Sequence, residues 1–335
     1  YIARHMRETG APGMTRALAN RNGLIRASTY GYADTKAGLK VVPETMFEIG
    51  SISKSFVGLA LLQLRDEGKL DLNKPVVEYL PWLKINSKFA PVTTHHILSH
   101  TAGLPGAPLL LDALLAELWT AYEPGKRFLY SNTGYNILGF LIEAIDKRPF
   151  AEAMRARLFT PLGMTASSPI ITSDLRRQMA IGYEPLSEGK PYSVHGPLAE
   201  AQWLEVDIAA GSIASTPADM VKYMPMLMNR GALPQGRLIS EDSFTLFTKR
   251  AINSPYRGEP ASRSGRRCTA GRDLQQRQGV RSLHRRSDRA CNHATSQRRD
   301  GEYDGRFRRM ERQSAHALSG ACHAHERRGF VNRLG

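Results

Sequence analysis

The sequence lacks any apolar run near the length of about 18 to 20 residues that a helix needs to cross a bilayer. Hydrophobic residues nevertheless make up 41% of its 335 residues, which is enough to bury a substantial core. We therefore predict a globular chain with no membrane span. A basic segment followed by an apolar stretch is also missing at its start, so no signal peptide is visible and localisation is unknown from these features.

Several enzyme signatures are absent too. No serine stands in G-x-S-x-G, which excludes the nucleophile turn of the α/β-hydrolases. Neither G-x-G-x-x-G nor a Walker A sequence occurs, so a nucleotide has no visible binding loop. We predict no cofactor.

Lysine and isoleucine are missing from residues 261–335, where 18 arginines face seven acidic residues. This segment therefore carries +11 of the formal charge of +15 and leaves +4 for residues 1–260. It also contains all three cysteines and shows no apolar period of 2 or 3.6. Such a segment buries too little apolar surface to offset its ordering entropy, so we expect disorder.

Two origins explain this composition. One is a basic arm that binds nucleic acid. The other is a slip of the reading frame near residues 256–262, because out-of-frame translation of GC-rich DNA yields arginine, serine, alanine, glycine, histidine and cysteine with almost no lysine or isoleucine. A selected basic arm normally mixes lysine with arginine. We therefore favour the frameshift, assign 256–335 to an aberrant tail, and expect no nucleic-acid partner.

Residues 1–255, in contrast, have the patterns of one folded domain. We predict strands within residues 1–48, including a hairpin whose turn lies at Asn22 and Gly23. Residues 51–250 are predicted to be mainly helical.

The helical part begins with a segment over residues 51–67 that is apolar on most sides, as in a helix at the centre of a domain. Gly68 is expected to end this helix, and the proline-containing stretch 74–83 predicts a loop.

The first turn of that helix, in "SISK", carries Ser51 and Lys54. Positions three apart share a helix face, which brings a hydroxyl and an amine within hydrogen-bonding reach. A serine becomes a nucleophile when a base takes its proton, and burial lowers the pKa of a lysine enough to serve as that base. Taken alone, the tetrapeptide also fits a serine N-cap followed by a surface lysine.

The surroundings favour the catalytic interpretation. In order and spacing, the chain resembles the serine β-lactamase and penicillin-binding-protein family, and within it the class C β-lactamase branch, which also contains DD-peptidases and family VIII carboxylesterases. The resemblance spans about residues 10–250 and rests on these blocks: "FEIGSISKSF", "GLALLQLRDEGKLDLNKPVVEYLP", "HHILSHTAGLPG", "PGKRFLYSNTGYNILGFLIE", "LFTPLGMTAS" and "AAGSIASTPADMVKYM".

This resemblance implies a role for each matching residue. Ser51 would be the acylated nucleophile, and Lys54 its partner in proton transfer. In "YSN", Tyr130 would relay a proton between the nucleophile and the leaving group, and Asn132 would bind the substrate amide or the lysine. The implied substrates are a β-lactam, a D-Ala-type peptide or a small ester, and the implied location is periplasmic or secreted.

The third motif of the family, Lys-Thr-Gly or His-x-Gly, is not found in this sequence. Its expected position falls within the arginine-rich segment, so the C-terminal strands of the family's sheet are expected to be missing or corrupted. The alternative to an active hydrolase is therefore a catalytically impaired remnant. For the rest of the chain the resemblance implies an α+β fold, with a central antiparallel sheet flanked by helices and a large helical region.

Three histidines in "HHILSH" remain as metal candidates. His96 and His100 have the i, i+4 spacing of a zinc pair, and His95 precedes them. No glutamate stands between them as in H-E-x-x-H, and the block matches a structural stretch of the family. We predict no metal site.

Overall fold

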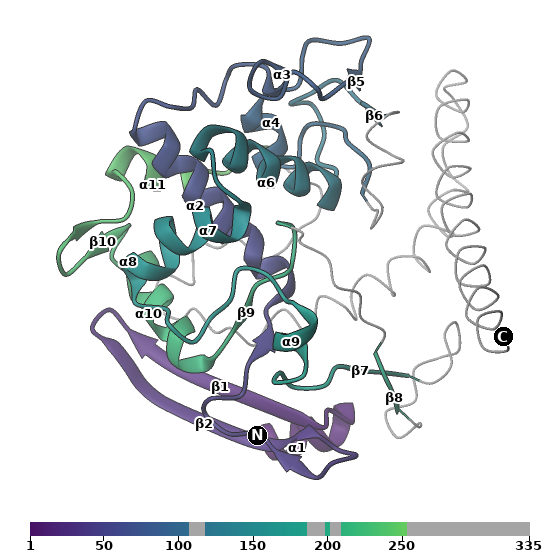
Figure 1. Cartoon of the computed structure of the whole chain (residues 1–335), viewed down its shortest axis with the longest axis vertical. Coiled ribbons are helices and arrows are strands. Elements are labelled where there is room, and N and C mark those ends of the chain that lie inside the picture. Colours follow the sequence, from purple (N-terminus) through teal and green to yellow (C-terminus); the bar gives the residue numbers. More distant parts are fainter. Residues whose placement is uncertain (107–117, 186–197, 202–208, 253–335) are drawn as a thin grey trace, which may run out of the picture. The chain divides into compact units, whose positions relative to one another are not determined.

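The computed structural model describes residues 1–106, 118–185, 198–201 and 209–252. By internal contacts the chain divides into two units, Tyr1–Gly271 and Arg272–Gly335, and every described residue belongs to the first. The aberrant tail expected over 256–335, and with it the expected loss of C-terminal strands, lies outside the described residues. The described part is a mixed α/β structure in which helices predominate (Figure 1).

The antiparallel sheet of the described residues has the order β1-β2-β3. Its first two strands form the predicted hairpin, which is confirmed, but the turn lies at Arg21 and Asn22, one position earlier than predicted, because Gly23 already pairs with Asn20. Elsewhere short strands pair two by two, β4 with β9, β5 with β6, β7 with β8 and β10 with β11. The strands are β1 (Gly13–Asn20), β2 (Gly23–Asp34), β3 (Leu39–Lys40), β4 (Phe47–Glu48), β5 (Ile85–Asn86), β6 (Leu118–Trp119), β7 (Tyr183–Pro185), β8 (Leu198–Glu200), β9 (Ala214–Ser215), β10 (Ala232–Leu233) and β11 (Gly236–Arg237).

The helices pack against the sheet and against one another. Helix α10 contacts both β1 and β2 of the sheet, and α2 contacts α6, α7 and α11. The helices are α1 (Ile2–Thr9), α2 (Ser53–Asp66), α3 (Val76–Tyr79), α4 (Thr94–Leu98), α6 (Asn132–Asp146), α7 (Phe150–Met154), α8 (Thr160–Leu162), α9 (Ser173–Arg176), α10 (Pro217–Met228) and α11 (Glu241–Thr248), with a 3-10 turn at Gly50–Ile52 and a π turn at Arg155–Phe159.

Residues 1–48 contain β1 to β4, as predicted, and α1 precedes these strands and ends at Gly10, whose φ is +65°. The loop predicted over 74–83 was wrong in part, because α3 begins directly after Pro75. A proline at the start of a helix removes no helical hydrogen bond, so it does not exclude a helix there. Gly68, with φ of +71°, ends the first long helix as predicted.

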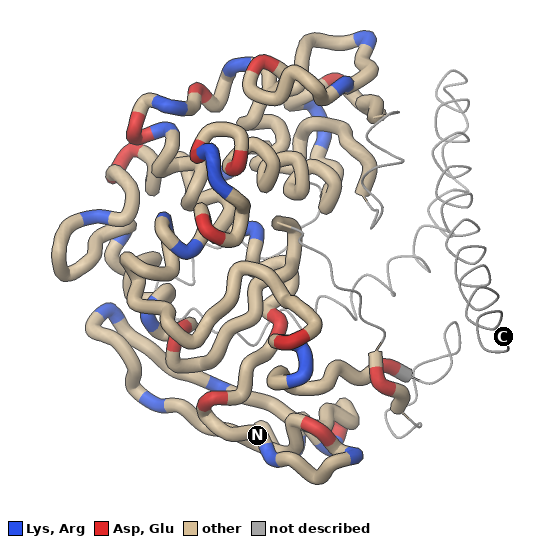
Figure 2. Tube along the Cα trace, in the orientation of Figure 1, with Lys and Arg blue, Asp and Glu red and all other residues tan. Residues whose placement is uncertain are grey.

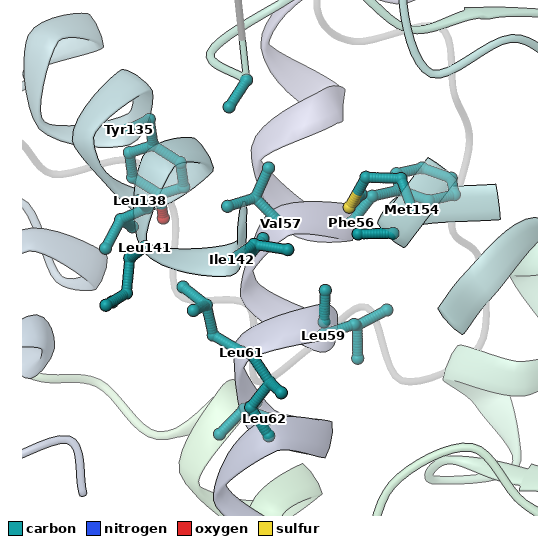
Figure 3. Close-up of a cluster of buried hydrophobic side chains, with 14 of the residues drawn as sticks. Phe56, Val57, Leu59, Leu61, Leu62, Tyr135, Leu138, Leu141, Ile142 and Met154 are labelled. Carbon is teal, nitrogen blue, oxygen red and sulfur yellow. The ribbon is translucent and has the colours of Figure 1, made fainter. Parts of the chain in front are cut away.

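Helix α2 is the centre of the hydrophobic core, as its all-round apolar sequence predicted. Phe56, Leu59, Leu61 and Leu64 are fully buried. Figure 3 shows side chains of α2 surrounded by those of α6 and by Met154 of α7. The position of α2 is therefore fixed on several sides at once, which is a requirement for a site that uses its first turn.

The far ends of α2 and α6 are joined by a buried arginine. Arg157, in the π turn, makes two hydrogen bonds of 2.5 Å to Asp146 at the end of α6. It also reaches Glu67, directly after α2, at 2.7 Å. The Asp146 side chain is 2% exposed and that of Arg157 is 9% exposed, so the charges are largely withdrawn from water. A bidentate ion pair fixes the relative orientation of the groups that carry it.

Breaking this ion pair is expected to destabilise the fold. Asp146→Asn leaves the Arg157 charge buried with only the half-exposed Glu67 as partner. Leaving a buried charge without any partner costs about 3 to 5 kcal/mol of unfolding free energy, and the pair that Arg157 keeps with Glu67 makes the expected loss smaller than that. Urea unfolding followed by circular dichroism measures this loss, and Asp174→Asn, in an exposed i, i+3 pair with Arg177, serves as the matched control. Equal midpoints for the two variants would contradict the prediction.

Charges of both signs are distributed along the described part of the trace, without a long basic stretch (Figure 2). This agrees with the small net charge found for residues 1–260. No helix of the described residues is long and apolar enough to cross a membrane.

Candidate active site

Ser51 lies at the point where β4 leads into α2. The two are joined by the 3-10 turn Gly50–Ile52, and Gly50 has φ of +52°, in the left-handed region that favours glycine. Ser51 is exposed, and its side chain is not the N-cap of either helical segment. The Lys54 ammonium donates a hydrogen bond of 3.2 Å to Ser51 Oγ, so the hydroxyl and amine expected to meet do so.

Tyr130 reaches the same hydroxyl from a different part of the chain. It lies two residues before α6, and its hydroxyl donates to Ser51 Oγ at 2.7 Å. Its ring centroid is 5.0 Å from Lys54 Nζ. The next residue, Ser131, is the N-cap of α6 and accepts a hydrogen bond from Gly134 N, which fixes the chain direction at Tyr130. The structure thus brings together three of the four predicted site residues.

Lys54 is buried, with only 6% of the residue exposed. Its ammonium donates a second hydrogen bond of 2.6 Å to the carbonyl of Ala210. The ring of Tyr135 lies 5.5 Å away on another side. Burial penalises the charged form and lowers the pKa of Lys54 from 10.5 to about 8. A substantial fraction of this lysine is therefore neutral near pH 8 and able to accept a proton.

Asn132, the fourth predicted residue, is the first residue of α6 and is half-buried. Its backbone N–H donates to the carbonyl of Gly106 at 3.0 Å. Its side chain has no hydrogen-bond partner within the described ranges, so the structure does not join it to Lys54 there. The amide remains available to another group.

His100 supports Tyr130, a role that the sequence had not revealed. Its ring stacks on the Tyr130 ring with centroids 4.4 Å apart. Its Nδ1 accepts a hydrogen bond from the backbone N–H of Ser131 at 3.1 Å. Burial, and secondarily the charge of Lys54, lowers the pKa of His100 to about 4. The imidazole is thus neutral at physiological pH, as this acceptor role requires.

The histidines considered for metal binding have other roles in the structure. His96 forms a capping box with Thr93 at the start of α4. His100 packs against Tyr130 as described above. Among the described residues no group of three His, Cys, Asp or Glu side chains is arranged to hold a metal ion.

The geometry of these side chains defines a class of site. An exposed serine, a buried lysine three residues later and a tyrosine directly before the next long helix meet at one hydroxyl oxygen. Such a constellation suits acyl transfer through a serine nucleophile.

The sequence profile of the Beta-lactamase family matches residues 1–282. The chain belongs to this family of β-lactamase-related serine hydrolases, and the resemblance expected from the sequence is confirmed. The match extends past residue 255, the predicted end of the domain.

Similar proteins agree with this assignment. A beta-lactamase of Yersinia enterocolitica is 32% identical over 242 residues, which cover 69% of this chain and 58% of that protein. Protein flp of Staphylococcus aureus (strain N315) is 31% identical over 188 residues, 52% of this chain and 38% of that protein. The chain thus spans less than two thirds of the length of either relative.

Solved structures show the same fold. The octameric penicillin-binding protein homologue from Pyrococcus abyssi has a TM-score of 0.66 at 28% identity, covering 76% of this chain and 60% of that one. FmtA from Staphylococcus aureus has a TM-score of 0.58 at 25% identity, covering 73% and 68%. The described residues therefore have a β-lactamase/transpeptidase-like fold.

Proposed function

We propose that this chain is a serine hydrolase in which Ser51 forms an acyl-enzyme with its substrate. One observation carries the proposal. Ser51 Oγ lies 3.2 Å from Lys54 Nζ and 2.7 Å from Tyr130 OH, so two groups that exchange protons meet at the nucleophile. Lys54 can act as the base because its pKa is lowered to about 8.

The proton movements follow from this arrangement. Neutral Lys54 takes the Ser51 proton as Oγ bonds to the substrate carbonyl carbon, which forms a tetrahedral intermediate. Tyr130, in contact with the same oxygen, gives its proton to the leaving nitrogen or oxygen as the carbonyl carbon releases it, and the proton held by Lys54 then restores the Tyr130 hydroxyl. Water next attacks the acyl carbon: its hydroxyl completes the acid, and its proton passes through neutral Lys54 to Ser51 Oγ as the ester bond breaks.

Asn132 is proposed to bind the substrate amide. Its side chain is half-buried at the start of α6, two residues after Tyr130, and has no hydrogen-bond partner in the described ranges. An amide can both donate and accept, which suits it to the amide of a β-lactam or peptide.

The substrate is proposed to be a β-lactam, a D-Ala-type peptide or a small ester. All three present a carbonyl that a serine can attack. The relative from Yersinia enterocolitica is named a beta-lactamase, which favours a β-lactam as the first compound to test.

Turnover by the purified full chain tests the function. We expect hydrolysis of nitrocefin or of p-nitrophenyl acetate, together with a covalent adduct between Ser51 and a fluorescent penicillin. Ester turnover without nitrocefin turnover would assign the chain to the esterases, and the reverse to the β-lactamases. A D-Ala-D-Ala peptide assay covers the remaining class.

The second candidate is a catalytically impaired remnant of such an enzyme. It is supported by the missing Lys-Thr-Gly or His-x-Gly sequence, which the resemblance places on a strand facing the nucleophile. The absence of turnover and of any adduct on Ser51 would establish this candidate and refute the first. Such a remnant could arise from a shifted reading frame or from natural loss of the third motif. Resequencing the coding DNA near codon 258 distinguishes these origins, because a frameshift predicts that the motif is encoded in another reading frame.

A further inference from the structure

One side of α6 holds the chain segment that lies against Lys54. The side-chain oxygen of Asn136 accepts a hydrogen bond from the backbone N–H of Ala210 at 3.1 Å. The carbonyl of the same alanine accepts the 2.6 Å hydrogen bond from Lys54. Asn136 and Ala210 are both buried, so water competes little for either bond. A chain of two hydrogen bonds thus runs from α6 to the ammonium.

Gly139 allows the same segment to approach α6 closely. A Cβ added at Gly139 would lie 2.7 Å from the Cβ of Ala209, closer than real Cβ atoms approach. A side chain at this position would push Ala209 away from the helix and carry the neighbouring Ala210 with it. Two independent features of α6 therefore position the carbonyl of Ala210. One is the side-chain oxygen of Asn136, which accepts a hydrogen bond, and the other is the absence of a side chain at Gly139.

Beyond Ala210 the segment has anchors of its own. The N–H of Ile213 donates to Ser53 Oγ at 3.2 Å, and β9 pairs with β4 at Phe47 and Ser215. These contacts do not involve α6. Disturbing Asn136 or Gly139 should therefore displace the carbonyl of Ala210 and leave the rest of the segment in place.

The carbonyl is important because no carboxylate of the described residues pairs with Lys54. The groups that face the ammonium are Ser51, the rings of Tyr130 and Tyr135, and the more distant His100. The Ala210 oxygen accepts the shorter of the two hydrogen bonds that the ammonium donates, and a carbonyl stabilises the charged form by its dipole.

We propose that Asn136 and Gly139 are positioning residues that hold the Ala210 carbonyl against Lys54 and so set its protonation. The inference deepens the proposed function of Lys54 as proton acceptor and rests on it. Neither residue touches the substrate or the reacting atoms.

Asn136→Leu and Gly139→Ala test the proposal by two different routes. Each variant should move the carbonyl away, so the ammonium loses an acceptor and the pKa of Lys54 falls by about one unit or more. The 13Cε chemical shift of Lys54 in the full chain, assigned by its absence in Lys54→Met, reports this pKa without any substrate. The acid limb of the kcat/KM profile should move to lower pH by the same amount.

A compensating change provides the rescue. Adding Ala209→Gly to Gly139→Ala removes the Cβ that clashes, so the double variant should regain the unmodified titration. Leu141→Ala, a fully buried position on the same helix, is the control for lost packing, and its Lys54 titration should stay unchanged.

The two proposals fail in different ways. An unaltered Lys54 titration in both Asn136→Leu and Gly139→Ala would overturn the positioning role, as would an equal shift in Leu141→Ala. A shifted titration in a chain that turns over no substrate would support the positioning role and refute the proposed function. If Asn136→Leu does not fold, the comparison of Gly139→Ala with the double variant Gly139→Ala, Ala209→Gly tests the positioning role by itself.

Discussion

Ser51→Ala is expected to abolish turnover and acylation together. The variant removes the oxygen at which Lys54 and Tyr130 meet, so no acyl-enzyme can form. Loss of a serine nucleophile lowers kcat by several orders of magnitude, at least about a thousandfold. Initial rates with nitrocefin and p-nitrophenyl acetate measure the first effect, and intact mass after incubation with a penicillin measures the second. Because the serine is exposed, the fold should be unaffected.

Ser55→Ala is the matched control for this experiment. Ser55 lies one turn further along the helix, where its hydroxyl donates to the Ile52 carbonyl and accepts from Tyr223. Its removal costs stability by leaving the buried tyrosine unpaired, but it does not touch the nucleophile. Ser55→Ala should therefore unfold more easily and still form the adduct. Persistent turnover in Ser51→Ala would mean that another residue is the nucleophile.

Lys54→Met is expected to produce a chain that is inactive yet more stable at neutral pH. Folding lowers the pKa of Lys54 from 10.5 to about 8, so the unfolded chain binds more protons than the folded one between these values. Unfolding free energy therefore rises with pH across that window and is reduced by a constant amount below pH 8. A shift of this size corresponds to roughly 3 kcal/mol, and methionine removes the penalty.

Urea unfolding at pH 7 and at pH 10 measures this difference. The advantage of Lys54→Met over the unmodified chain should be largest at pH 7 and shrink as the pH approaches 10. Lys126→Met, at a position whose side chain is 67% exposed, should show neither effect. For the unmodified enzyme, kcat/KM should rise about tenfold per pH unit up to the pKa of Lys54 near 8. Equal stabilities at both pH values would contradict the burial argument.

The local parts of the site followed directly from the sequence. Ser51 and Lys54 meet because positions three apart share a helix face, and the central place of α2 follows from its all-round apolar pattern. Gly68 ended that helix for the reason expected of a residue with positive φ.

The remaining parts depend on contacts between distant segments. Tyr130 lies 79 positions from Ser51, and only family resemblance could place it there. Lys54 contacts the backbone carbonyl of Ala210. Any residue at position 210 would offer the same carbonyl, so the sequence does not reveal this contact. His100 also acts through contacts with a distant segment, because its ring stacks on Tyr130 and accepts a hydrogen bond from Ser131, which lies 31 positions away in sequence. Proline misled the prediction at α3, because its effect depends on whether it begins or interrupts a helix.

The ion pair of Arg157 connects the C-terminal ends of α2 and α6. Both helices carry site residues at their beginnings and are linked through Glu67 and Asp146 at their ends. A helix of 14 residues is about 21 Å long, so a rotation of roughly 3° about the linked end moves the first turn by about 1 Å. A displacement of that size would disturb a catalytic hydrogen bond, so the ion pair, together with the core packing of α2, contributes to the position of the nucleophile from a full helix length away.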